Sequence, residues 1–418
     1  MRRASIVLFV VTLVAFHAVM VSTMWTRAKA TPGAADFASF YYAEQVAAAG
    51  ENPYDTARLD AAAQQQGTRP HVYPFFYPPP FLLTTAWTFP LALHPAYLAW
   101  FWLDELVAVL CGLVLWRWWR QLGPSVGWFA AVAVATTASI PDNHYMGQMN
   151  LLVLLIALGG LWAEERDRHA LGGLLVGLAA MLKMSPALFV GWWLLRRRWR
   201  AAAWACGTAV VLDLLALPLA GPAVQADFYL RVLPSFGSGD YNNLRVWIAV
   251  FENYSLPAYY ARLFPGDTGG VGLSGPAHLL SVLTALGLVV GLGALFWRAS
   301  EDRWARAGQV GAVCIATLLL PVFTFEHHLV WGLPAVVVLG AALARGILPA
   351  RAALAVAPAW VGWAWSFPQL FIAAQGSPAV ANLLHDVKTW SLLVLFAACA
   401  YLGAHGAPER SAGAEPAA

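Results

Sequence analysis

The sequence predicts an all-α, polytopic membrane protein, and two observations carry that prediction. Hydrophobic residues make up 60% of the 418 residues, charged residues make up only 11%, and the mean hydropathy is +0.61. This composition lies outside the range of soluble proteins. Apolar runs near the ~20 residues that cross a bilayer also recur along the chain and predict about 12 transmembrane helices, at 5–24, 95–116, 125–141, 149–163, 170–184, 186–196, 201–220, 276–297, 307–323, 328–344, 351–366 and 388–404.

Arginine clusters predict the orientation of these helices. With the spans above, every cluster falls on one side, and cytoplasmic loops are the ones enriched in Lys and Arg. We therefore predict a multi-pass protein of the cell membrane with both chain termini in the cytoplasm. Its single transmembrane domain, 1–404, has long external loops at 25–94 and 221–275, and a disordered cytoplasmic tail follows at 405–418. The clusters are Arg2 with Arg3, Arg117 with Arg120, Arg166 with Arg168, Arg196 to Arg200, Arg298 with Arg303 and Arg306, and Arg345 with Arg351.

Three apolar segments need separate treatment. The first run is longer than a usual signal-peptide core, which favours a retained anchor over a cleaved signal. Segment 75–93 contains four prolines, and counting it as a span would move Arg117 outside. Its aromatic residues suit short helices at the membrane interface. Segment 170–196 is predicted to form two helices that meet at Pro186, because proline breaks a helix.

A lone carboxylate, Asp36, opens a segment that suits a short helix in the first external loop. One interpretation is a helix cap. The other is a general base for a sugar hydroxyl, which needs an ionised and poorly screened carboxylate and gains from the aromatic neighbours Tyr41, Tyr42 and Tyr77. Asp36 has no second acid at a two-residue spacing. We therefore expect chemistry without a metal or another cofactor.

Two further polar groups are predicted at the same membrane face. Glu326, His327 and His328 lie where one apolar run stops and the next begins. They either form a solvated turn or contribute one imidazole to a phosphate site, with the other held by a neighbour such as Glu326. Gln148 and Asn150 either cap the following helix or bind sugar hydroxyls.

Cationic side chains suggest where a phosphate would bind. Lys183 lies inside an apolar stretch, where a cation needs an anionic partner unless it only snorkels to the surface. Arg262, on the third external loop with Asn253 nearby, is a second candidate because its planar guanidinium can bond two phosphate oxygens.

Several motifs, taken in order, resemble a known family. They are Asp36-Phe37 with Tyr41-Tyr42, Asn52-Pro53-Tyr54-Asp55, Tyr77-Pro78-Pro79, Gly147-Gln148-Met149-Asn150, the segment 177–186 with Lys183-Met184-Ser185-Pro186, Asn253-Tyr254-Ser255-Leu256 and Glu326-His327-His328. Together, over about residues 30 to 345, they resemble glycosyltransferase family 87, polyprenyl-phosphate-mannose-dependent mannosyltransferases of the GT-C fold.

The resemblance implies an inverting membrane hexosyltransferase. It would take a hexose, usually mannose, from a polyprenyl-phosphate donor and transfer it to a glycolipid or glycan at the external face. The acidic residue of the first external loop, here Asp36, would be the general base. The scheme assigns the donor phosphate to Lys183, His327, His328 and Arg262, and the sugar and acceptor to Tyr41, Tyr42, Tyr77, Gln148, Asn150, Asn253 and Glu326. Membrane lipid is an expected partner and nucleic acid is not.

Two alternatives stay open on the sequence. A transporter or flippase for a lipid-linked or small polar substrate would place ionisable residues near mid-membrane, whereas most polar clusters here lie at span ends. A pentosyltransferase or glycan ligase on the same scaffold would share these motifs. Met149 and Tyr254 replace the Val and Gln that are common in the family, and these departures leave the acceptor open.

Overall fold

The structure is a computed structural model that describes residues 2–31, 35–68, 71–244, 246–266, 272–297, 299–365, 384 and 386–407. Within these ranges the protein is helical and has no strand, as predicted. The helices are α1 (Arg2–Ala30), α2 (Ala35–Ala48), α3 (Thr56–Gln65), α4 (Phe81–Thr85), α5 (Leu93–Trp119), α6 (Ser125–Thr136), α7 (Ser139–Met146), α8 (Asn150–Glu164), α9 (His169–Leu182), α10 (Ala187–Leu195), α11 (Trp199–Asp227), α12 (Leu233–Ser235), α13 (Leu256–Leu263), α14 (Gly275–Phe296), α15 (Arg303–Leu319), α16 (Leu333–Ala344), α17 (Ala353–Ala364) and α20 (Val387–His405). Short 3₁₀ turns lie at Ala86–Thr88, Arg120–Leu122, Phe236–Ser238, Glu326–Gly332 and Ala350–Ala352, and Phe228–Val232 is a π-helical turn.

Six helical stretches of the described chain are long and apolar enough to cross a membrane, and the bent pair α7 and α8 would add a seventh. Each of the twelve predicted runs contains a helix, but several of these helices are short. The count of twelve spans therefore stays a prediction. The six stretches are Ser5–Ala30, Leu93–Leu122, Trp199–Ser238, Gly275–Phe296, Glu326–Ala344 and Val387–His405.

The helices in two proline-containing segments are interrupted as predicted. Segment 75–93 holds only α4 and the turn Ala86–Thr88, so it forms no helix long enough to span a bilayer. Segment 170–196 forms α9 and α10, and Pro186 immediately precedes α10. Lys183 lies in the break between these two helices, and its side chain lines an internal cavity.

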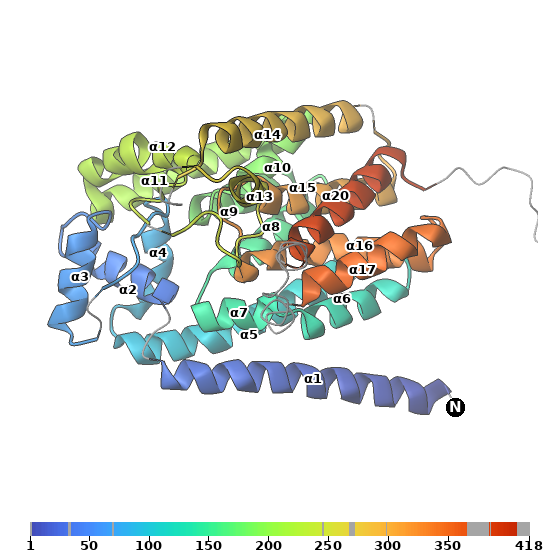
Figure 1. Ribbon diagram of the computed structural model, residues 1–418, viewed down its shortest axis with the longest axis horizontal. Coiled ribbons are helices and arrows are strands. Elements are labelled where there is room, and N and C mark those ends of the chain that lie inside the picture. The colour runs from blue at the N-terminus through green and yellow to red at the C-terminus, as the bar shows by residue number, and fades with distance from the viewer. Residues whose placement is uncertain are drawn as a thin grey trace, which may run out of the picture.

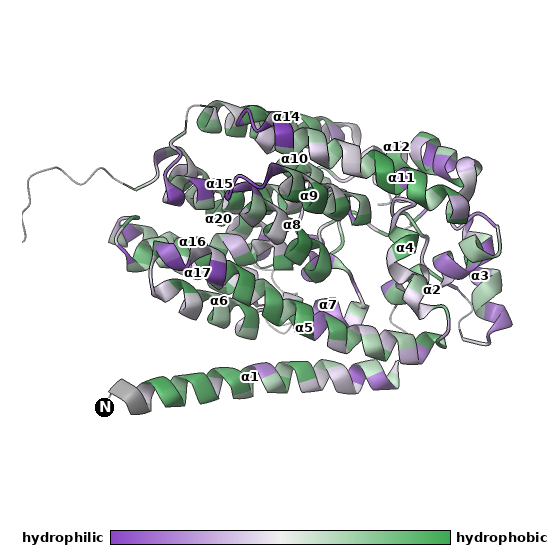
Figure 2. Ribbon diagram, turned by 180° about the vertical axis from the view of Figure 1, so that it is seen from behind, coloured by the Kyte–Doolittle hydropathy of each residue, from purple (hydrophilic) through white to green (hydrophobic). Residues whose placement is uncertain are grey.

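Most of the long helices run roughly along one direction, and a group of short helices lies at one end of the bundle (Figure 1). There, α2, α3 and α4 lie at the end away from the N-terminus. Helices α1 and α14 lie along opposite edges, and Figure 2 shows both as largely hydrophobic. Their large apolar side chains are exposed, among them Val7 and Val290. Apolar helix surfaces of this kind suit contact with lipid.

The predicted basic loops meet in space. Arg196 and Arg198 both pair with Glu301, which brings the α10–α11 turn against the α14–α15 loop. The side chain of Arg345 lies against Gly123 in the turn between α5 and α6. The turns that carry these contacts lie toward the end of the bundle opposite α2 and α3 (Figure 1).

Small residues let neighbouring helices approach closely. A Cβ atom on Gly173 or Gly177 of α9 would lie 2.4 Å or 2.5 Å from a backbone oxygen of α11. Glycine at these positions therefore permits the close α9–α11 contact typical of membrane helices.

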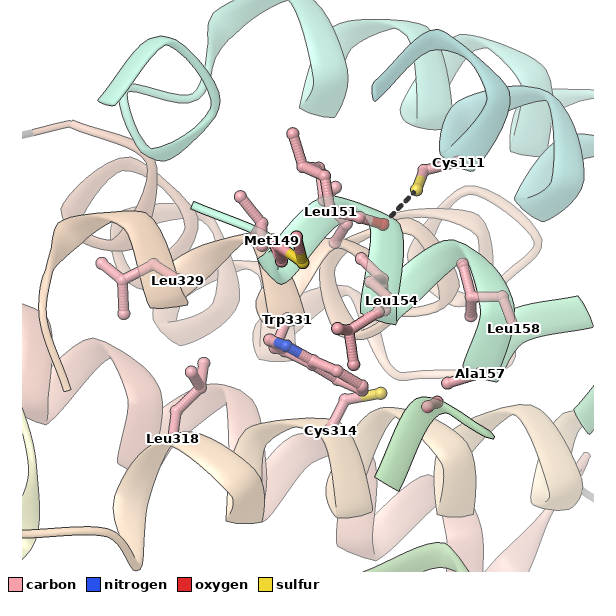
Figure 3. Packing of buried hydrophobic residues seen from close by; sticks show 14 of the residues in the cluster. Cys111, Met149, Leu151, Leu154, Ala157, Leu158, Cys314, Leu318, Leu329 and Trp331 are labelled. Carbon is pink, nitrogen blue, oxygen red and sulfur yellow. Dashed lines mark hydrogen bonds between the residues drawn. The ribbon is translucent and has the colours of Figure 1, made fainter. Parts of the chain in front are cut away.

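The centre of the molecule is closely packed beneath the short helices. In Figure 3 the indole ring of Trp331 lies between Met149 and Leu154 on one side and Leu318 and Cys314 on the other. All five residues are almost completely buried. Trp331 and Leu318 of this packed layer also line the cavity that contains the polar side chains.

Candidate active site

One cavity of about 990 Å³ opens among α2, the turn between α7 and α8, the break between α9 and α10, and the Glu326–Gly332 turn. The structure brings Asp36 and the distant imidazoles of His327 and His328 into this one cavity. The predicted site residues that line it are Asp36, Tyr77, Gln148, Asn150, Lys183, Glu326, His327 and His328.

Asp36 lies in the first turn of α2 and is bonded to the amide of Gln148, whose Nε2 donates to Asp36 Oδ2 at 2.8 Å. The Oε1 atom of the same amide is 3.4 Å from Lys183 Nζ and 3.4 Å from the Tyr77 hydroxyl. Gln148 thus presents its donor to the carboxylate and its acceptor to a cation and a phenol. One amide bridges the anionic and cationic groups of the cavity.

The turn that carries Gln148 depends on a glycine. Gly147 has φ +67° and ends α7, with its N–H directed to the carbonyl of His144 at 3.1 Å. A Cβ at this position would lie 2.6 Å from the Cβ of Phe37, the residue next to Asp36. Because only glycine accepts both constraints without strain, the chain can bend by 117° between α7 and α8.

Gln148 and Asn150 do not serve the capping role considered from the sequence. Met149 is the residue that caps α8, and it makes no side-chain cap hydrogen bond. The Asn150 amide instead accepts from Lys183 Nζ at 2.6 Å through Oδ1 and donates to Asn143 Oδ1 at 3.0 Å. Both amides face polar groups rather than the start of α8.

Lys183 reaches the cavity because α9 ends one residue before it. Its backbone is extended, at φ −153° and ψ 123°, and Pro186, three residues later, immediately precedes α10. Besides Asn150 and Gln148, the ammonium group lies 5.7 Å from the centre of the Tyr77 ring. The side chain therefore points into the cavity and does not snorkel away from it.

Tyr77 is a buried phenol beside the carboxylate. Its ring packs edge-on against Phe40 and is stacked on Phe76. Burial, and then the negative charge of Asp36, raise the pKa of Tyr77 above its ordinary value. The phenol consequently stays protonated at neutral pH and can act only as a neutral hydrogen-bonding group.

The two histidines are held differently. His328 Nδ1 accepts the backbone N–H of Phe325 at 2.9 Å, which leaves the proton of a neutral imidazole on Nε2. His327 Nδ1 lies 3.5 Å from Asp142 Oδ2. The carboxylate beside His327 is therefore that of Asp142, whereas Glu326 accepts from Lys388 Nζ at 3.1 Å and from the Tyr254 hydroxyl at 3.3 Å.

Four predicted site residues do not lie among the described residues that line the cavity. The Tyr41 hydroxyl donates to Leu91 O at 2.8 Å, and the Tyr42 hydroxyl bonds to Thr68. Asn253 Nδ2 donates to the backbone oxygens of Ile248 and Val322, each at 2.9 Å. Arg262 pairs with Asp386 and donates to Asn253 O at 3.1 Å. The structure thus corrects their expected placement, because their polar atoms hold loops together.

Two carboxylates and a cation near the site were not predicted from the sequence. Asp142 and Glu252 line the cavity, and Lys388 holds Glu326 from α20. Lys388 was visible as one of only three lysines in the chain, and Asp142 as a charge at the end of an apolar run. Neither signal reveals which way a side chain points.

The cavity has polar groups toward Asp36 and a large apolar wall elsewhere, so it can accept a molecule with a charged head and a hydrocarbon tail. The wall includes Phe76, Leu188, Phe236, Leu244, Val246, Val250, Leu318 and Leu320. Among the described residues no group of three His, Cys, Asp or Glu side chains is arranged to hold a metal ion. Metal independence stays a prediction.

Comparison with known proteins identifies the family. The model of glycosyltransferase family 87 matches residues 75–321. The chain is 32% identical over 339 residues to the polyprenol-phosphate-mannose-dependent alpha-(1-2)-phosphatidylinositol pentamannoside mannosyltransferase of Mycobacterium tuberculosis (strain CDC 1551 / Oshkosh), with 78% of this chain and 73% of that protein covered. It is 30% identical over 333 residues to the protein of the same description from Mycolicibacterium smegmatis, with 77% and 76% covered.

A further relative in Mycobacterium tuberculosis (strain ATCC 25618 / H37Rv) is a polyprenol-phosphate-mannose-dependent alpha-(1-2)-phosphatidylinositol mannoside mannosyltransferase. It is 28% identical over 222 residues, which is 51% of this chain and 47% of that protein. The helical membrane architecture, the cavity and these matches agree, and the chain belongs to glycosyltransferase family 87.

Proposed function

We propose that this chain transfers mannose from a polyprenyl-phosphate donor to a glycolipid acceptor, with Asp36 as the general base. The observation that carries the proposal is the single amide of Gln148, which joins Asp36 to Lys183 inside a cavity with an apolar wall. A carboxylate suits the acceptor hydroxyl, a cation suits the donor phosphate, and an apolar wall suits a prenyl chain. The names of the relatives support the same donor and a phosphatidylinositol mannoside class of acceptor.

The proposed reaction is one displacement at the anomeric carbon. The acceptor hydroxyl loses its proton to Asp36 as its oxygen bonds to that carbon. The bond from the carbon to the phosphate oxygen breaks, and its electron pair leaves with the polyprenyl phosphate. A single displacement of this kind inverts the anomeric configuration. Asp36 fits the base role because one of its oxygens already accepts a hydrogen bond that keeps it oriented.

The leaving phosphate needs positive groups where its charge develops, which is commonly the largest catalytic contribution. Lys183 supplies a positive charge, the Nε2–H of neutral His328 supplies a hydrogen-bond donor, and His327 lines the same cavity. Arg262 is withdrawn from the phosphate site because it is paired with Asp386. Asn150, Tyr77 and Glu326 remain candidates for the sugar hydroxyls.

The lipid tail fits the apolar part of the cavity wall, which includes Phe236, Leu244, Val246, Val250, Leu318 and Leu320. We place the cavity at the external face of the cell membrane, because the arginine clusters gather at the opposite end of the bundle.

The proposal is tested with purified protein in vesicles, supplied with labelled mannosyl-phosphoprenol and a phosphatidylinositol mannoside. We expect labelled glycolipid and free polyprenyl phosphate. Movement of intact donor across the vesicle without cleavage would instead indicate a transporter. Transfer from a pentosyl-phosphoprenol but not from the mannosyl donor would show that the donor sugar is a pentose and not mannose.

A further inference from the structure

Asp104 lies in the middle of α5, a stretch long and apolar enough to cross the membrane, and its side chain is completely buried. A carboxylate in such a position is costly and usually has a function. Asp104 is not among the described residues that line the cavity, so it does not touch a substrate bound there. Its role must be sought in what it holds.

The Oδ2 atom of Asp104 has two close partners in α7. It accepts from Asn143 Nδ2 at 2.6 Å and lies 2.8 Å from His144 Nδ1. The other ring nitrogen of His144 lies 2.8 Å from Glu105 Oε2, and Glu105 Oε1 lies 2.9 Å from His17 Nε2 on α1. The two neighbouring carboxylates of α5 thus share one imidazole, but Asp104 is the one that accepts from Asn143.

Asn143 holds the α7–α8 turn together through hydrogen bonds to Gln148 and Asn150. Its Nδ2 also donates to Gln148 O at 3.0 Å, and its own backbone oxygen accepts from Gln148 N at 3.0 Å. Its Oδ1 accepts from Asn150 Nδ2 at 3.0 Å. The side chain is completely buried, so these bonds are not exchanged with bulk water.

Two chains of hydrogen bonds connect Asn143 to charged groups of the cavity, one to Asp36 and one to Lys183. The first chain passes through Gln148, whose Nε2 donates to Asp36 at 2.8 Å. The other runs through Asn150, which accepts from Lys183 at 2.6 Å. Both chains of hydrogen bonds start at Asn143, and Asp104 orients Asn143 by accepting from its Nδ2.

We infer that Asp104 is a positioning residue for transfer, which acts through Asn143 to fix Gln148 against Asp36 and Asn150 against Lys183. The inference rests on the proposed function of Asp36 and Lys183. A buried acceptor that fixes two reacting groups at once has a large effect on rate, because a displacement of ~1 Å can cost about 100-fold.

Asp104→Leu and Glu105→Leu are a matched pair of variants. Each removes one carboxylate from His144, and the two sites are adjacent on α5, but Asp104→Leu alone removes the acceptor of Asn143. With the donor and acceptor that the wild-type protein uses, we expect Asp104→Leu to lower kcat by about 10-fold to 100-fold. Glu105→Leu should change kcat by less than about threefold while lowering the melting temperature.

Asn143→Ala supplies a second variant that leaves both carboxylates in place. It should reproduce the loss of kcat, and the double variant with Asp104→Leu should lose no more than about threefold beyond the worse single variant. Unfolding is excluded by a monodisperse elution profile in detergent. A contribution to stability alone would instead give additive losses.

Equal losses in Asp104→Leu and Glu105→Leu, or full activity in Asn143→Ala, would overturn the inference while leaving the proposed function intact. Failure of the wild-type protein to cleave any polyprenyl-phosphate sugar would overturn the proposed function itself. The two failures are therefore distinguishable in the same experiment.

Discussion

At the scale of single residues, the cavity is organised by opposite charges that share neutral amides. Asp36 and Lys183 do not form a direct ion pair among the described contacts, and Gln148 bonds to both. A direct pair would screen the carboxylate that the proposed reaction uses as a base and occupy the cation that we propose for the donor phosphate. The amide keeps both groups oriented and available, which is the arrangement expected of a preorganised site.

Asp36→Asn separates the base role from a capping role, because Asn and Asp cap helices equally well. Loss of a general base is expected to lower kcat by about 10²-fold to 10⁴-fold, measured as release of polyprenyl phosphate. Asp55→Asn is the matched control, since Asp55 caps α3 by accepting from Ala57 N at 2.9 Å. The control should keep wild-type activity. Substantial activity in Asp36→Asn would remove Asp36 from the base role.

At the scale of elements, the site is built where helices stop. Asp36 lies at the start of α2, Gln148 in the turn between α7 and α8, and Lys183 just after α9. Backbone groups at helix ends are not all used within the helix, and the chain there can direct polar side chains inward. Helix breaks at Gly147 and Pro186 therefore bring polar side chains into the cavity of an otherwise apolar bundle.

Gly147→Ala tests this element. The φ of +67° costs a non-glycine residue about 1–2 kcal/mol, and the added methyl would press on Phe37 and displace α2. We expect both a lower melting temperature and a fall in kcat of about 10-fold or more. Gly50→Ala is the control, because Gly50 has φ +76° with nothing within 4 Å of the added Cβ. It should lose stability and keep its rate. Equal kcat in the two variants would contradict the role of the turn.

At the scale of the whole molecule, the cavity and the basic loops lie toward opposite ends of the helix bundle. The short helices α2 to α4 lie toward one end of the bundle, and the α14–α15 loop and the α5–α6 turn lie toward the other (Figure 1). The cavity lies beside α2, and arginine side chains contact both of these loops. The long apolar helices between them present hydrophobic side chains outward (Figure 2). A lipid-linked donor could therefore keep its tail in the bilayer while its head enters the cavity.

The predicted orientation is tested by labelling single cysteines in whole cells. Ala61→Cys lies on exposed α3, and Ala350→Cys lies on the exposed turn before α17. Cys206, the exposed native cysteine, is replaced first. A membrane-impermeant maleimide should label the first variant in intact cells and the second only after permeabilisation. The reverse pattern would place the cavity on the cytoplasmic side.

Part of the site could be predicted from the sequence, for a physical reason. Asp36, Gln148 and Lys183 stand out because each is polar at a break in an apolar pattern. Asp104 and Asp142 were missed because they lie inside or at the end of apolar runs, where only a partner from another helix explains them. Arg262 and Asn253 were expected at the site, because the sequence does not show that Arg262 pairs with Asp386 or that Asn253 donates to the carbonyl of Val322.

The sequence by itself determined the membrane class, the helical character of each apolar run and the positions where helices break. These properties are local, because hydropathy and the effects of proline and glycine act through neighbouring residues. Only the tertiary structure decided which polar side chains share a cavity and which hold loops together. That choice depends on hydrogen bonds between distant helices, such as Gln148 with Asp36 and Asn143 with Asp104, and no local pattern encodes their directions.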